Sequence, residues 1–221
     1  MQHQVEGMTK LKPEQKDLKK AKRLAEKGIE KAQGELPKNE EVKVGFSWTE
    51  EPFALENMNG VSGKSFGSHY FHVSFNSDVK MWKKALIGTA IHEYGHTYFY
   101  ENIEQDYSEV LWRYILDEAL TQNLTKKLAP ESPEPWRTAH SIEEIAQYWP
   151  EIKEQLDREV NHPDPLYINK DDEGFPNWLG YSLSFRIGQK ILEDYNLEEF
   201  PNLDKQHVVK AGNKLFDEGK N

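Results

Sequence analysis

The sequence predicts one α+β domain in which a small N-terminal sheet precedes a largely helical remainder. Residues 42–48 and 69–75 alternate apolar and polar side chains with the period of half-buried strands. Most of the chain after residue 77 instead spaces its apolar residues as helices do. A length of 221 residues suits one well-filled hydrophobic core. We therefore expect a single domain over residues 41–221, preceded by a helix within residues 1–40.

Composition and charge exclude several classes of protein. The chain is 12% aromatic with six Trp, which is too much bulky apolar side chain for a disordered protein. Its formal net charge of -10 opposes a nucleic-acid partner, because such binding rests mainly on Lys and Arg. No window reaches the roughly 20 apolar residues that cross a bilayer, and the first residues do not resemble a signal peptide. We therefore expect a cytoplasmic protein without a membrane partner.

The absence of cysteine limits the chemistry of any metal site. With no Cys in the sequence, disulfides, thiolate ligands and a cysteine nucleophile are all excluded. Only His, Asp and Glu remain as metal ligands, so a metal would be held by nitrogen and oxygen atoms. Such a donor set favours a catalytic Zn²⁺ over a closed structural site.

The first 40 residues form a basic segment with one amphipathic helix. They contain ten Lys or Arg against seven Asp or Glu. From Pro13 to Gly34, small and apolar side chains recur at helical spacing. These are Leu18, Ala21, Ala25, Ile29 and Ala32. A charge run on a helix is usually a solvated face, and we assign this one no function.

Between the two predicted strands, the glycine-rich stretch NGVSGKSFGS indicates a flexible connection. It is not a phosphate-binding loop, because two residues instead of four separate Gly60 from Gly63. After the second strand we expect a long helix from Ser77, and then a second one that begins near Asp106 with capping-box spacing to Glu109.

The C-terminal half has two further parts. Residues 129–176 contain seven of the eleven prolines and two short helical pieces, SIEEIAQYW and PEIKEQLDREV, which favours a lid or small subdomain. The first piece has the capping-box pair Ser141 and Glu144. Two final helices are expected over residues 178–195 and 204–216.

The first long helix contains the HExxH pattern as His92, Glu93, Tyr94, Gly95 and His96. Four residues advance a helix by 400°, so the two imidazoles lie about 40° apart and about 6 Å apart along the axis. They can therefore bind one metal ion. Glu93 lies beside the ion, where it can take a proton from the attacking water. We expect the small residues around the histidines, Ala85, Gly88, Thr89 and Gly95, to leave room for metal and substrate.

A third ligand must come from another segment. A third His on the same helix would need Gly at position 99 and His at position 102, where the chain has Phe99 and Asn102. The next helix is apolar nearly all round, yet it has Asp117 and Glu118 at its centre. A buried carboxylate needs a partner, and a dication would supply one. Glu118 is the favoured ligand, since it shares its face with other polar residues; Asp117, His140 and a plain buried ion pair are the alternatives.

The segments HEYGH, LDEALTQ and PNWLGYSLSFRIGQKIL occur in this order. With them the chain resembles the YjaZ-like family of predicted zinc-dependent proteases, of gluzincin type, over about residues 42–195. The resemblance implies a zincin-like fold, with Zn²⁺ bound by His92, His96 and Glu118 and with Glu93 as general base. It also implies that a sheet edge above the site pairs with the substrate backbone, and residues 70–75 are placed in the sequence for that task.

The match to the family is incomplete. Ala119 stands where the family usually has Gly, and Thr121 where it usually has Ala, but the Glu118 carboxylate is retained. In the late segment, Ser184 replaces the second Gly and Phe185 replaces the second Tyr. Tyr181 does match, and the resemblance implies that its hydroxyl supports the oxyanion. The structural alternative for Tyr181 is a packed aromatic near a helix start.

The sequence therefore predicts a zinc metallopeptidase that acts on a peptide or protein substrate. The alternative is an inactive module that keeps zinc for stability and binds a protein partner. An open coordination position beside the metal would favour the enzyme, and a side chain that fills it would favour the module.

Overall fold

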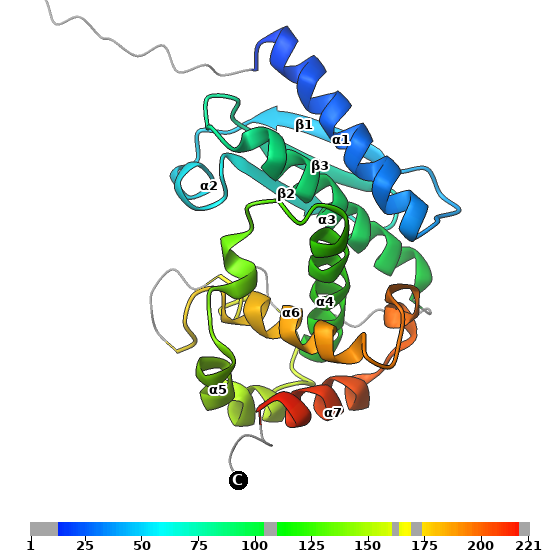
Figure 1. Cartoon of the computed structure of the whole chain (residues 1–221), viewed down its shortest axis with the longest axis vertical. Helices are drawn as coiled ribbons and strands as arrows, with labels where there is room; N and C mark the ends of the chain where they lie inside the picture. Colours follow the sequence, from blue (N-terminus) through cyan, green and yellow to red (C-terminus); the bar gives the residue numbers. More distant parts are fainter. Residues whose placement is uncertain (1–12, 104–109, 161–163, 169–173, 217–221) are drawn as a thin grey trace, which may run out of the picture.

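The computed structural model describes residues 13–103, 110–160, 164–168 and 174–216 (Figure 1). Its class is α+β, as predicted: three short strands lie at the N-terminal end and helices make up most of the rest. In chain order the elements are α1 (Gln15–Glu35), β1 (Lys43–Trp48), α2 (Pro52–Asn57), β2 (Val61–Ser65), β3 (Tyr70–Phe75), α3 (Trp82–Asn102), α4 (Leu111–Leu128), η1 (Pro135–Thr138), α5 (Ile142–Glu154), α6 (Leu179–Ile191), η2 (Leu197–Asn202) and α7 (Lys205–Phe216). Within these residues, no helix has both the length and the apolar character to cross a bilayer.

The sheet has the strand order β1-β3-β2. The predicted strands at residues 42–48 and 69–75 are β1 and β3, and they pair in parallel. Alternate residues of β3 are fully buried, namely Phe71, Val73 and Phe75. They form a core with Trp82 and Leu86 of α3, so one face of the sheet is covered by helices.

The stretch NGVSGKSFGS, predicted as a flexible connection, contains the strand β2, so that expectation was wrong. β2 pairs antiparallel with β3, and Gly60 and Gly67 flank it with φ of 74° and 83°, which are turn conformations that glycine adopts without strain. β3 is consequently the central strand. The expectation that residues 70–75 offer a sheet edge is also wrong, because β2 occupies the edge beside α3.

Helix α1 packs lengthwise on α3 through a row of small residues (Figure 1). Its buried positions are Ala21, Ala25, Gly28 and Ala32. A Cβ atom on Gly28 would lie 2.9 Å from the backbone oxygen of Ile87, so the two helices are in close contact there. The long helix expected from Ser77 begins later, at Trp82, and the start expected near Asp106 lies outside the described residues.

The remaining helices pack around α4 in a second core. α6 crosses α4, and α5 and α7 lie side by side at the far end (Figure 1). The first expected helical piece and the start of the second form a single helix, α5, in which Pro150 is exposed. The helix ends at Glu154, so residues 155–160 of the second piece are not helical. The predicted capping box between Ser141 and Glu144 is confirmed.

A buried ion pair ties the start of the sheet to the end of α3. Lys38 Nζ lies 2.8 Å from Glu101 Oε2, and the Lys38 side chain is 1% exposed. The same amino group donates hydrogen bonds to the backbone oxygens of Ser68 and Thr97. Glu101 Oε1 accepts from the backbone N–H groups of Asn39 and Glu40. This cluster therefore fixes the segment before β1 against the helix that contains HExxH.

Removing one partner of this pair should destabilise the fold strongly, because it leaves the other charge buried. We expect Lys38→Met to lower the free energy of unfolding by about 3 kcal/mol or more, measured by urea denaturation. Lys84→Met is the matched control, since it breaks the exposed pair with Glu131 (52% and 77% exposed) and should cost no more than about 1 kcal/mol. Equal effects of the two substitutions would contradict the role given to Lys38.

Candidate metal centre

The two histidines of the HExxH pattern point the same ring nitrogen at one place. His92 and His96 lie one turn apart on α3, and their Nε2 atoms are 3.1 Å from each other. Both rings are largely buried, with 13% and 11% of their side chains exposed. The local periodicity of a single helix produces this juxtaposition.

Glu118 of α4 completes the group. Its carboxylate oxygens lie 3.7 Å from His92 Nε2 and 3.7 Å from His96 Nε2. Two ligands at 2.0–2.2 Å from a tetrahedral zinc ion would be about 3.3–3.5 Å apart. The three donors are thus spaced as ligands of one ion, and among the described residues they form the group of His and carboxylate side chains suited to a metal.

Asp117 contacts the opposite side of His96. Its Oδ1 atom lies 2.8 Å from His96 Nδ1, so the ring donates to the carboxylate and leaves Nε2 for a metal. Sequence reasoning treated Asp117 as a rival ligand and missed this positioning role. A buried Asp next to the buried Glu was the available signal.

His140, the other rival ligand, lies elsewhere. Its Nε2 atom is 2.8 Å from the backbone oxygen of Asn177, and its backbone N–H donates to Ser182 Oγ. It therefore holds the segment before α6 and is absent from the group formed by His92, His96 and Glu118.

Glu93 lies beside the centre and contacts the edge strand β2. Ser65 Oγ is 2.7 Å from Glu93 Oε2 and 3.0 Å from the Glu93 backbone oxygen. A Cβ atom on Gly63 would lie 2.4 Å from Glu93 Oε1. The strand thus fixes this carboxylate with one hydroxyl and with the space that one glycine leaves. The sequence analysis missed Gly63 and Ser65, since no pattern in the sequence connects these residues of β2 to Glu93 on α3.

The glycines of α3 serve packing instead of leaving room for a ligand, so that expectation was wrong. A Cβ atom on Gly95 would lie 2.9 Å from Thr121 Cγ2 on α4. One on Gly88 would overlap Ser132 and lie 3.0 Å from Glu134 Oε1. The smallness of these residues lets α4 and the segment after it approach α3.

Burial and neighbouring charges set the protonation of the metal-free centre. Burial lowers the pKa of His92 well below its usual value. Burial also opposes the charged form of His96, but the Asp117 carboxylate outweighs it and raises the pKa of His96 to about 10. Burial raises the pKa of Glu118 to about 8 and, in the same direction, the pKa of Glu93. His96 and Glu118 therefore both hold protons at neutral pH.

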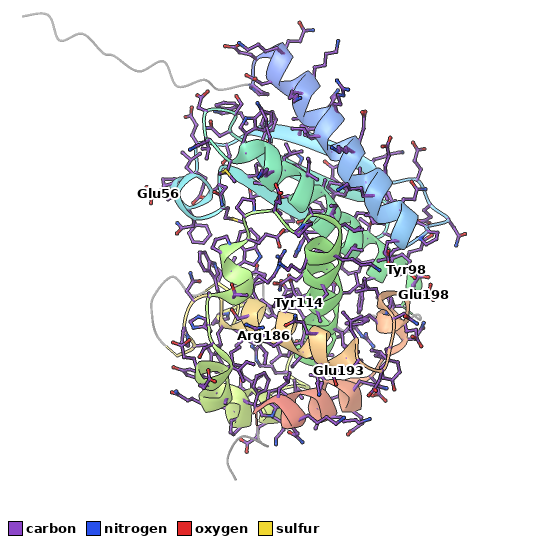
Figure 2. The ribbon with its side chains drawn as sticks, in the orientation of Figure 1. Glu56, Tyr98, Tyr114, Arg186, Glu193 and Glu198 are labelled. Atoms are coloured by element: carbon purple, nitrogen blue, oxygen red, sulfur yellow. The ribbon has the colours of Figure 1, made fainter. Side chains whose placement is uncertain are left out.

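A cavity of about 590 Å³ opens onto these groups. His92, Glu93, His96 and Glu118 line it, together with Tyr114 of α4 and Tyr181 of α6. Figure 2 shows Tyr114 between these two helices. Burial raises the pKa of both tyrosines, and the charge of Glu118 adds to the shift, so both hydroxyls remain protonated donors.

Aromatic side chains form another part of the cavity lining, and one of them has a strained backbone. Trp178 has φ of 68° and ψ of 8°, the left-handed region that bulky residues rarely adopt. Such a conformation costs about 1–3 kcal/mol and persists only where the surrounding structure enforces it.

Metal binding should release protons and should strengthen as pH rises, because zinc accepts only deprotonated ligands. At pH 7, His96 and Glu118 (pKa about 10 and about 8) are both protonated in the metal-free protein, so we expect release of about two protons per zinc ion. Titration calorimetry in buffers of different ionisation enthalpy measures this number. Asp117→Asn should release about one proton fewer, since it removes the group that raises the pKa of His96. Binding heats that are independent of the buffer would refute this account.

No curated protein and no solved structure gave a match. One family model, described as "Predicted Zn-dependent protease (DUF2268)", matches residues 21–210. This span contains α3, α4 and every side chain of the candidate centre, and it agrees with the family that the sequence motifs indicated. The chain therefore belongs to this family of predicted Zn-dependent proteases.

Proposed function

We propose that this chain is a cytoplasmic zinc metallopeptidase that hydrolyses peptide bonds. The observation that carries the proposal is the convergence of two imidazoles and one carboxylate at a cavity, with a second carboxylate beside them that is not part of the group. The name of the family, predicted Zn-dependent protease, supports the same reaction.

In this proposal His92, His96 and Glu118 hold the ion. A bound Zn²⁺ would supply Lewis acidity, which polarises the scissile carbonyl group and acidifies water. Glu93 accepts a proton from the attacking water and delivers it to the leaving amine. Its burial and its contacts with Ser65 and the edge of β2 support this role, because a general base must be held within hydrogen-bonding reach of the reacting atoms.

We assign Tyr181 the support of the oxyanion. Its ring packs edge-on against Tyr167, with centroids 5.0 Å apart, and tilted against Trp136 at 6.4 Å. Its side chain lines the cavity, and burial together with the charges of Glu118 and Glu93 keeps its pKa high, so the hydroxyl remains a donor. Packing of the ring positions the hydroxyl and does not compete with this role.

The substrate would lie along β2 in an extended conformation. Gly63, Lys64 and Ser65 of this edge strand line the cavity, which supports pairing of the substrate backbone with the sheet and a zincin-like architecture. The described part of residues 129–176 would cover the other side, since Glu134, Trp136 and Ile168 line the cavity as well. We propose that this segment is a lid and that the basic helix within residues 1–40 precedes the metallopeptidase domain.

The cavity also bears on the alternative, a zinc-stabilised binding module without turnover. Such a module needs no access to its metal. Here a space of about 590 Å³ adjoins the three candidate ligands, with Glu93 at its wall, which supports the enzyme.

Glu93→Gln should retain zinc and lose hydrolysis, because the amide keeps the size of the side chain but cannot accept the proton. We expect kcat to fall by at least about 10²-fold on an unstructured protein substrate, at unchanged metal content. Glu56→Gln is the matched control, since this glutamate is exposed on α2 at the outer edge of the molecule (Figure 2). A Glu93→Gln protein as active as the control would refute the assignment.

Tyr181→Phe should lower kcat by about 10²-fold with little change in KM, because the hydroxyl acts only on charge that develops during the reaction. Steady-state kinetics beside Tyr114→Phe tests this, since Tyr114 also lines the cavity. A larger loss in Tyr114→Phe than in Tyr181→Phe would transfer the role to Tyr114.

A further inference from the structure

Three aromatic residues from separate segments meet along the cavity, and we call them the aromatic wall. They are Phe53 of α2, Trp136 of η1 and Trp178, which precedes α6. The ring of Trp178 lies 6.2 Å from that of Phe53 and 6.4 Å from that of Trp136, in edge-to-face arrangements. All three are half-buried and line the cavity, so part of each ring faces the open space.

The wall adjoins the candidate centre. The ring centroids of Trp136 and Tyr181 are 6.4 Å apart. Tyr181 lies close enough to the centre for the charges of Glu118 and Glu93 to raise its pKa in addition to burial. A peptide whose scissile bond lies at the centre would therefore place a neighbouring side chain against the wall.

The backbone of Trp178 is held in its strained conformation from both sides. Its N–H donates to the Tyr167 oxygen, and its own carbonyl oxygen accepts from Ser182 as the first turn of α6 begins. His140 bonds the oxygen of the preceding residue, Asn177. Glycine would adopt this conformation without strain, so the local backbone gains nothing from Trp. What the indole adds is its surface in the cavity, and strain of this kind is concentrated at ligand sites.

The wall itself consists of uncharged side chains. Glu134 lines the same cavity, but it forms a buried ion pair with Arg137, and the two side chains are 4% and 7% exposed. Lys64, the other charged side chain of the described lining outside the candidate centre, is exposed. A charged substrate side chain would therefore lose its hydration against the three rings. Glu134 is already paired, and Lys64 on β2 belongs to none of the elements that form the wall.

We propose that the aromatic wall is the subsite for a large apolar side chain next to the scissile bond, so that the preferred substrates are peptides with Phe, Leu or Met at that position. The inference rests on the proposed peptidase function and specifies its substrate class. Aromatic faces around a cavity select such side chains through the apolar area that they remove from water.

The test compares three unstructured peptides that differ at one residue, which is Phe, Ala or Glu, with the cleavage point located by mass spectrometry. We expect the parent to cleave beside Phe with kcat/KM at least about tenfold above the Ala and Glu peptides. Trp178→Gly removes the indole and also relieves the backbone strain. It should therefore keep its unfolding midpoint and metal content while its kcat/KM for the Phe peptide falls about tenfold and that for the Ala peptide stays constant. Phe53→Ala, on a different element, should shift the preference in the same direction and carries the test if Trp178→Gly does not fold.

A binding measurement separates this inference from the proposed function. Fluorescence anisotropy of the labelled Phe peptide on Glu93→Gln protein, with and without Trp178→Gly, should show about a tenfold rise in Kd when the indole is removed. A parent that binds zinc and cleaves none of the peptides would overturn the peptidase, whereas the anisotropy would still decide the subsite. Equal cleavage of the three peptides, or a Phe preference that survives both wall substitutions, would overturn the subsite.

Discussion

The contact between His96 and Asp117 is the interaction on which the rest of the centre depends. It joins α3 to α4 through buried atoms, and it fixes both the tautomer and the orientation of the imidazole. Because Glu118 follows Asp117 directly, the same contact brings the Glu118 carboxylate to the Nε2 side of that ring. Two adjacent carboxylates thus approach the opposite nitrogens of one histidine. Close packing at Gly95 permits this approach, because a larger residue there would separate the two helices.

The edge strand β2 is the part of the small sheet that contacts the candidate centre. β3 carries the apolar residues that anchor the sheet to α3, whereas β2 contributes little apolar surface and instead contacts Glu93. The strand and the helices therefore contribute different side chains to the candidate centre. α3 carries His92, Glu93 and His96, and α4 carries Glu118. β2 fixes where the Glu93 carboxylate points, through Ser65 and Gly63. The ion pair of Lys38 and Glu101 keeps the segment before β1 in place at the other end of the helix.

The sequence predicts best the arrangement that one helix determines by itself. The shared face of His92 and His96 follows from helical geometry, and Glu118, a carboxylate in an otherwise apolar helix, lies beside them. The roles of these residues and of Glu93 stay predictions. The helical projection placed Asp117 on a different face from Glu118, yet both reach His96 because neighbouring positions straddle a ring from a facing helix. β2 escaped prediction because Gly63 leaves space for a side chain on another element, and such glycines resemble a loop. The left-handed Trp178 carries no local signal, since its backbone is held by Tyr167, which is distant in the sequence, and by the bond of His140 to Asn177.

Protons and a divalent cation can satisfy the same electrostatic requirement in this protein. Glu93, Asp117 and Glu118 are buried close to two imidazoles, and burial disfavours uncompensated negative charge. In the metal-free state one proton on His96 and one on Glu118 supply the compensation. A dication that replaces both protons leaves the net charge of the cluster unchanged. We therefore expect α3 to stay packed on α4 without the metal, unlike small domains whose folding free energy comes from metal binding. Two hydrophobic cores, one between the sheet and α3 and one around α4, supply apolar contacts that are independent of a bound ion.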